Sequence, residues 1–220
     1  MLENISLEAR PGEFVAVVGP SGAGKSTLLR LLLGFEAAQR GSVLYDGQNL
    51  MHVDRVSLRR QLGVVLQDAR LMPGDLFTNI VGSSTLGEED AWHALRLAGL
   101  EEEVRAMPMQ LHTVVTDGSG GLSGGQRQRL MIARAVVAKP RVLIFDEATS
   151  ALDAKTQEQV SNSLANLQAT RIVVAHRLST IRKADRIYVV HNHKIEQVGT
   201  FEELASTPVF FAEFARRQMA

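Results

Sequence analysis

The sequence predicts an α/β fold in which helices cover a parallel or mixed β-sheet. Three observations carry this prediction. Apolar, strand-like runs alternate with helix-like segments along much of the chain, which is typical of a sheet covered by helices. A glycine-rich loop lies between one strand-like run and a helix-like segment, and the stretch from residue 68 to about residue 121 is poor in strand-like runs. The 220 residues, 45% of them apolar, suffice for one domain with a subdomain.

The first predicted strand leads directly into the glycine-rich loop. Residues 3–8, "ENISLE", alternate apolar and polar side chains, and Arg10-Pro11-Gly12 is typical of a turn. The apolar run "EFVAVV", residues 13–18, then predicts a buried strand. After the loop we expect a helix from about Lys25 to Leu33 that stops at Gly34, because glycine commonly ends a helix.

Further strands and helices follow in order. The runs "SVLY" before Asp46-Gly47, and "GVVL" from Gly63, predict two strands, and the second ends at Gln67. From residue 68 to about 121 the spacing of apolar residues predicts short helices; these residues are Ala91, Leu95, Ala98 and Val104. The runs "VLIF", "RIVVA" and "RIYVV" then predict three strands, and "NHKIEQVGT", residues 192–200, is typical of the return arm of a hairpin.

Composition excludes several classes of function. The 24 basic and 24 acidic residues cancel, and a nucleic-acid partner usually requires a basic excess, so we expect none. The absence of cysteine excludes disulfides and thiolate metal sites. The richest apolar run, Leu28 to Phe35, is too short to span a bilayer and includes Arg30. The first ten residues lack the order of a secretory signal, so we expect a cytosolic chain.

The glycine-rich loop has the pattern of a phosphate-binding site. "GPSGAGKS" fits G-x-x-x-x-G-K-[ST] between a predicted strand and helix. Glycines let backbone N–H groups point at phosphate oxygens, Lys25 would reach the β and γ phosphates, and Ser26 could ligate Mg²⁺. The alternative is a loop that only turns the chain. The candidate nucleotide-binding residues are Gly19, Pro20, Ser21, Gly22, Ala23, Gly24, Lys25, Ser26 and Thr27.

Two carboxylates follow the predicted strand at residues 142–145. Asp146 suits a direct or indirect hold on Mg²⁺, and Glu147 could orient or deprotonate a water that attacks the γ-phosphate. Taken alone, two acids after a strand are as often simply a strand meeting solvent.

A second glycine-rich stretch, "TDGSGGLSGGQRQRL", occupies residues 116–130. Ser123 and Gln126 have the S-x-x-Q spacing of a capping box, which predicts a helix that starts at about Gly124. A helix N-terminus bare of side chains can bind an anion. The candidate γ-phosphate ligands here are therefore Ser123, Gly124, Gly125 and Gln126.

"LSGGQ", residues 122–126, resembles the signature sequence of ATP-binding-cassette (ABC) ATPases. The resemblance covers nearly the whole chain, since the motifs follow in that family's order: Walker A at 19–26, a Q-loop glutamine at Gln67, the signature, Walker B at 142–146, "SALD" at 150–153 and His176. It implies a P-loop NTPase fold. Residues 1–67 and about 122–220 would form a RecA-like core of mixed or parallel sheet with an antiparallel β-subdomain, and residues 68–121 an inserted helical subdomain.

The resemblance also implies how the sites work. Two domains would pair head to tail around two MgATP, and each signature helix would cap the ATP held by the other domain's P-loop. Glu147 would be the catalytic carboxylate, His176 would contact the γ-phosphate, and Gln67 would reach Mg²⁺ and the attacking water. Asp153 would cross the dimer interface. The Mg²⁺ ligands would be Ser26, Gln67 and Asp146.

Details resemble exporters more than importers. "DEATSALD" has Ala148 where importers more often have proline, "VAHRLSTI" is similar to exporter sequences, and "TDGSGG", residues 116–121, resembles the acidic stretch that exporters place against a membrane domain. Residues 107–130 also resemble bacteriocin-exporting half-transporters of the NHLM type. The likeness implies a transmembrane domain as partner, a peptide or bacteriocin cargo, and a position on the cytoplasmic side of the cell membrane.

One feature departs from the exporter pattern. Exporter domains carry an upstream aromatic residue that stacks on adenine, whereas the first aromatic residue here is Phe14. We therefore expect the chain to be the C-terminal piece of a longer polypeptide that continues upstream into a transmembrane domain.

Other interpretations stay open at this point. The main rival is a soluble, non-transport ABC ATPase of the DNA-repair or translation-associated kind, and a second is a regulatory cassette that binds ATP without hydrolysis. His176 and Gln67 could be ordinary packed or loop residues, and Asp153 suits the N-cap of the next helix in any case. Intramolecular pairing suits the arginines of the signature helix better than nucleic acid does; these are Arg127, Arg129 and Arg134. "HNH" at 191–193 fits a hairpin turn better than a metal site.

Overall fold

The structure, a computed structural model, describes residues 2–115, 121–206 and 211. The chain divides into two compact units. The first unit comprises the described residues of Met1–Arg59 and Thr170–Ala220, and the second unit is Arg60–Ala169. Each unit combines parallel strands with helices, so the predicted α/β class is confirmed. The predicted division at residues 67/68 and about 121/122 stays a prediction, and part of the exporter-like stretch, residues 116–120, lies outside the described residues.

The first unit is built on a mixed sheet whose central strand is the predicted run before the glycine loop. Strand β1 (Phe14–Val18) lies between β8 (Thr170–Val174) and β9 (Arg186–His191) and is parallel to both. Strand β10 (Lys194–Gly199) pairs antiparallel with β9. Every residue of β1 is buried, which is typical of parallel strands, because both faces of their sheet are usually covered.

Four helices lie in the described part of the first unit. Helix α1 (Lys25–Leu32) ends with the cap residue Leu33, directly before Gly34 at φ 68°, so the predicted stop is confirmed. The others are α2 (Arg55–Arg59), α8 (Leu178–Ile181) and α9 (Phe201–Ser206). Apolar residues of α8 and α9 pack with β1 and β9 in one core, in which the rings of Phe201 and Phe211 meet edge to face at 5.7 Å between centroids.

Two hairpins of the first unit have left-handed turns. Strands β2 (Leu44–Tyr45) and β3 (Gln48–Asn49) flank Asp46 and Gly47, both with positive φ. This hairpin shortens the strand predicted at 42–45. The β9–β10 hairpin turns at Asn192 and His193, also with positive φ. The predicted return arm at 192–200 is therefore confirmed.

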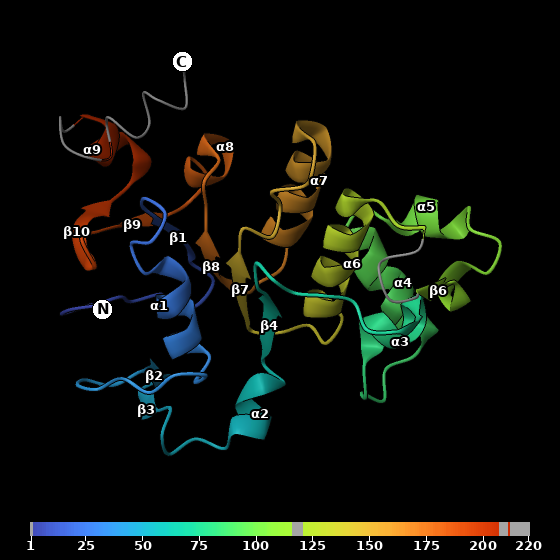
Figure 1. Cartoon of the computed structure of the whole chain (residues 1–220), viewed down its shortest axis with the longest axis horizontal. Coiled ribbons are helices and arrows are strands. Elements are labelled where there is room, and N and C mark those ends of the chain that lie inside the picture. The colour runs from blue at the N-terminus through green and yellow to red at the C-terminus, as the bar shows by residue number, and fades with distance from the viewer. Residues whose placement is uncertain (1, 116–120, 207–210, 212–220) are drawn as a thin grey trace. The chain divides into compact units, whose positions relative to one another are not determined.

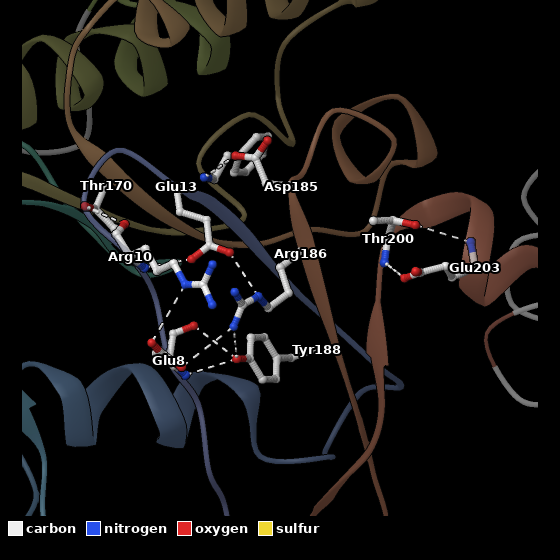
Figure 2. Close-up of polar contacts among 10 residues, drawn as sticks. Glu8, Arg10, Glu13, Thr170, Asp185, Arg186, Tyr188, Thr200 and Glu203 are labelled. Carbon is white, nitrogen blue, oxygen red and sulfur yellow. Dashed lines mark hydrogen bonds and ion pairs between the residues drawn. The ribbon is translucent and has the colours of Figure 1, made fainter.

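A polar network joins the segment before β1 to β9 (Figure 2). The Tyr188 hydroxyl accepts a hydrogen bond from the Glu8 amide and donates one to the Glu8 carbonyl, both at 3.0 Å, and Arg186 pairs with Glu13 at 2.9 Å. Residues 3–8 nevertheless form no strand despite their alternating pattern. Asn4, at φ 50°, leaves the extended conformation that a strand needs.

The second unit carries a parallel pair of strands and most of the helices. Strand β4 (Leu62–Val65) pairs with β7 (Val142–Asp146), and the short strands β5 (Gly74–Asp75) and β6 (Val114–Val115) pair antiparallel. The helices are α3 (Leu76–Val81), α4 (Glu88–Leu97), α5 (Glu101–Arg105), the 3₁₀ turn η1 (Gln110–His112), α6 (Gly124–Val136) and α7 (Ala154–Ala165).

Helix α6 is the central helix of the second unit. It packs against α3, α4 and β4 (Figure 1), and Leu130, Ile132 and Ala133 are fully buried. Among the described residues, no helix has both the length and the apolar character needed to cross a bilayer.

Candidate functional site

The glycine loop of the first unit has the local geometry of an anion site. It connects Val18, the last residue of β1, to Lys25, the first residue of α1. Gly24 is the N-cap of α1 with φ 102°, a left-handed conformation that glycine adopts without strain. No side chain caps this helix start. The first N–H groups of α1 are thus available to an anion, which the partial positive charge of the helix end favours.

Lys25 lies inside this loop. Its side chain is 7% exposed, and Nζ donates hydrogen bonds of 2.9 Å to the carbonyl oxygens of Gly19 and Pro20. Carbonyl groups are neutral acceptors, whereas the oxygens of a phosphate are charged and would attract the same ammonium more strongly. The loop therefore holds the Lys25 ammonium against its own backbone. Ser26 and Thr27 are exposed, so their hydroxyls can reach a ligand.

His176 lies at the same edge of the first unit's sheet as this loop. The parallel register pairs Val17 of β1 with Val174 of β8, so the loop after β1 and the residues after β8 leave the sheet at the same edge. His176 follows two residues after Val174 and is half-buried. The structure thus brings the predicted γ-phosphate contact and the P-loop to one edge of one unit.

The second unit places the predicted carboxylates and glutamine at one edge of its own strand pair. Val65 of β4 pairs with Phe145 of β7, so Gln67 and Glu147 follow their strands at corresponding positions. Asp146 is 3% exposed at the end of β7, Glu147 is half-buried and Gln67 is exposed. Glu147 has φ 54°, a left-handed conformation that costs a non-glycine residue about 1–3 kcal/mol.

The start of α6 is capped as the sequence predicts. Ser123 is the N-cap, its hydroxyl accepts from the Gln126 amide at 3.1 Å, and the Ser123 amide donates to Gln126 Oε1 at 2.8 Å. The Gln126 side chain also donates to Glu103 on α5 at 2.7 Å. The capping box is confirmed, and a contact that sequence spacing could not reveal fixes its glutamine.

The two glycines that follow Ser123 are not required by the second unit itself. A Cβ added at Gly124 would lie 3.8 Å from the nearest atom, Nη2 of Arg127, and one at Gly125 would lie 3.5 Å from the carbonyl oxygen of Ala151. Both are ordinary van der Waals distances, and neither glycine has positive φ. Packing and backbone conformation both tolerate a side chain at these two positions, so neither explains the glycines.

The arginines of α6 have intramolecular partners, as interpreted from the sequence. Arg127 donates to the Leu122 carbonyl at 2.8 Å, and Arg129 pairs with Glu103 at 2.6 Å. Burial would raise the pKa of Glu103, but hydrogen bonds from Arg129 and Gln126 outweigh it and hold this pKa below its usual range. Arg134 donates to the Asn79 carbonyl at 2.6 Å, and burial lowers its pKa.

Asp153 caps helix α7. Its carboxylate accepts from the Thr156 amide at 3.0 Å and from the Thr156 hydroxyl at 2.6 Å. These bonds hold the pKa of the exposed Asp153 below its usual range. The N-cap prediction is confirmed, while the role of Asp153 at a dimer interface stays a prediction.

The residues at 191–193 belong to the β9–β10 hairpin. His191 pairs with Glu196 on the neighbouring strand at 2.8 Å between Nδ1 and Oε2. No group of three or more His, Asp or Glu side chains in the described parts of the chain could hold a metal ion by itself.

The sequence analysis did not identify one residue that contacts the turn after β7, where Glu147 lies. Gln128, on α6, donates to the Glu147 carbonyl at 3.2 Å and accepts from the Ala151 amide at 2.8 Å. Its only signal in the sequence is its place on the signature helix.

Comparisons with known proteins place the chain among ABC transporter proteins. The family model described as ABC transporter matches residues 2–150. The chain is 45% identical over 221 residues to an uncharacterized ABC transporter ATP-binding protein, YwjA, of Bacillus subtilis, covering 99% of this chain and 38% of the relative. It is 44% identical over 209 residues to the alpha-hemolysin translocation ATP-binding protein HlyB of Escherichia coli O157:H7, covering 94% of this chain and 30% of the relative.

Two further likenesses extend over the full chain. The cyclolysin secretion/processing ATP-binding protein CyaB of Bordetella pertussis is 44% identical over an alignment of 223 residues, covering 99% of this chain and 31% of CyaB. A solved structure of a bacterial Atm1-family ABC exporter with ATP bound superimposes with a TM-score of 0.94 and 38% identity, over 100% of this chain and 39% of that one. The chain thus spans between three and four tenths of the length of these proteins.

Proposed function

The chain belongs to the ABC transporter family, and on that premise we propose that it is the ATP-hydrolysing nucleotide-binding domain of an exporter, which works as a head-to-tail dimer around two MgATP. One observation carries the proposal. Each unit has a helix whose start is lined with glycine, α1 after the P-loop and α6 after Ser123, and α6 does not need its glycines for its own fold.

The two helix starts have complementary tasks. The start of α1 and Lys25 would hold the β and γ phosphates of one ATP. The start of α6 would meet the γ-phosphate held by a second copy of the chain, which explains why its glycines are open to the outside. Asp153, exposed at the start of α7, would contact that second copy.

The hydrolysis itself would use residues that follow the parallel strands. Water attacks the γ-phosphorus, the bond to the β,γ-bridging oxygen breaks, and ADP leaves. Glu147 would accept the proton of that water, and Gln67 would help to orient it. His176 would donate a hydrogen bond to the γ-phosphate, where charge develops.

The predicted Mg²⁺ ligands carry donor atoms of the right kind. Ser26, Gln67 and Asp146 offer a hydroxyl, an amide and a carboxylate oxygen, and hard oxygen ligands are those that Mg²⁺ prefers. When bound, Mg²⁺ would neutralise charge on the β and γ phosphates.

The role in export rests on the relatives. HlyB and CyaB are named for translocation and secretion, and the similar solved structure is an exporter. We propose by analogy that this domain acts on the cytoplasmic side of the cell membrane, contacts a transmembrane domain, and powers export of a polypeptide such as a peptide or bacteriocin.

Glu147→Gln tests the proposal. The amide keeps the size of the side chain but cannot accept a proton, so ATP turnover should fall by about 10²-fold or more while ATP binding persists and the dimer accumulates. Glu158→Gln, on the exposed face of α7, is the matched control and should hydrolyse at the wild-type rate. Normal hydrolysis by Glu147→Gln would refute the role of Glu147, and full turnover by a monomer at any dilution would refute the composite site.

A further inference from the structure

Gln128 connects the signature helix to the segment that carries the proposed catalytic carboxylate. It lies on α6, two residues after Gln126, and is 9% exposed. Both the nitrogen and the oxygen of its side-chain amide form hydrogen bonds. Nε2 donates to the Glu147 carbonyl at 3.2 Å and to Ser150 Oγ at 3.3 Å, and Oε1 accepts from the Ala151 amide at 2.8 Å.

These bonds act where the backbone is strained. Glu147 has φ 54°, and a strained residue keeps its conformation only when its surroundings hold it. Its carbonyl oxygen accepts from the Ser150 amide at 3.0 Å within the turn and from Gln128 outside it. Because the backbone angles of Glu147 set the direction of its side chain, the hydrogen bond from Gln128 influences the direction in which the carboxylate points.

We propose that Gln128 is a positioning residue for Glu147. It holds the turn at 147–151 so that the Glu147 carboxylate faces the attacking water, and it ties that orientation to the position of α6. The inference rests on the proposed function, in which the start of α6 meets the ATP of the second copy. Binding of that ATP would then affect the Glu147 carboxylate of this chain's own site through Gln128, which lies two residues after Gln126 on the same helix.

The test compares two buried glutamines of the second unit. Gln128→Met keeps the length of the side chain and removes its hydrogen bonds, and Gln157→Met makes the same replacement on α7, where Gln157 is 4% exposed. If Gln128 positions Glu147, Gln128→Met should lower kcat by about 10²-fold and change KM for ATP less than about twofold. Gln157→Met should lose stability with kcat unchanged.

Hydrogen exchange of the Ala151 amide reports the contact directly, because this N–H donates to Gln128. It should exchange faster in Gln128→Met and at the wild-type rate in Gln157→Met. Gln128→Glu is the second variant. It keeps the acceptor for Ala151 but, when ionised, cannot donate to the Glu147 carbonyl, so it should protect the Ala151 amide and still lose turnover.

The outcomes distinguish the positioning role of Gln128 from the proposed ATPase function. Wild-type kcat in a folded Gln128→Met or Gln128→Glu variant overturns the positioning role, and so does an equal loss of kcat in Gln157→Met. A wild-type chain that binds but does not hydrolyse ATP overturns the proposed function, and this inference with it. Wild-type hydrolysis together with an unimpaired Gln128 variant overturns this inference alone.

Discussion

Replacing Gly124 by alanine separates what the fold needs from what the composite site needs. Gly124 is the first residue of α6, and an added Cβ would meet Arg127 Nη2 at 3.8 Å and Ala151 Cβ at 3.9 Å. Both contacts are ordinary, and φ is not positive. Alanine also restricts the unfolded chain more than glycine does. The variant should therefore be as stable as the wild type, or more stable by up to about 1 kcal/mol.

Turnover should respond in the opposite way. In the dimer, the new methyl group would lie where the γ-phosphate approaches the first N–H groups of α6, and it would hold the phosphate away from them. Loss of one such donor to a developing charge typically costs about 10²–10³-fold in rate, or about 2.7–4 kcal/mol. Gly124→Ala should thus lose at least about 10²-fold in kcat while the P-loop still binds ATP.

The assay needs three measurements and one control. Thermal unfolding gives stability, nucleotide titration gives binding, and steady-state hydrolysis gives kcat. Gly87→Ala is the control, because Gly87 is the N-cap residue of α4 in the same unit and a Cβ there would meet open space; its kcat should equal that of the wild type. A Gly124→Ala variant with normal kcat would refute the phosphate contact, and one that unfolds would refute the claim that the fold tolerates a side chain there.

Two further predictions concern the second unit. Arg134→Met removes a part-buried hydrogen bond to the Asn79 carbonyl and an exposed one to the Arg70 carbonyl. It should lower the free energy of unfolding by about 1–3 kcal/mol, because the Asn79 carbonyl loses this donor. Urea titration measures the change, and no loss would show that these bonds contribute nothing net. His112 bonds Asp75 and contacts Glu88, and the bond to Asp75 is the main reason that the pKa of His112 is raised. The stabilisation is complete below the unfolded-state pKa of about 6.5 and is lost as pH rises through the folded-state value. The difference in Tm between wild type and His112→Ala should therefore shrink from pH 6 to pH 8.5, and a constant difference would contradict it.

The sequence predicted those features that depend on residues near one another in the chain. The strand, loop and helix around Lys25 follow from an apolar run, glycines and a helix stop, and all of these are local. The capping box at Ser123 and the N-cap at Asp153 need only a spacing of three residues. The same reasoning found the β9–β10 hairpin, because its turn residues are adjacent.

The features that it missed depend on contacts between distant segments. Gln128 contacts Glu147 and Ala151, 19 and 23 residues away, and no local pattern shows which way an amide on a helix will face. Residues 3–8 illustrate the opposite error. Their alternation is typical of a strand, but a strand also needs a partner ladder, and Asn4 in a left-handed conformation interrupts the extended backbone.

Helix α6 is well suited to connect a ligand at its start with the two segments that would orient the attacking water. It has 13 residues and is therefore about 20 Å long. Gln128 and Arg134, six positions apart, lie about 120° apart around the axis, so they face different neighbours. Gln128 contacts the turn that carries Glu147, and Arg134 donates to the carbonyl of Arg70 in the loop after Gln67. Since a helix moves as a stiff body, a shift of the start of α6 would move its contacts with both the Glu147 turn and the loop after Gln67. A substitution at Gln128 or at Arg134 would loosen only the segment that this residue contacts.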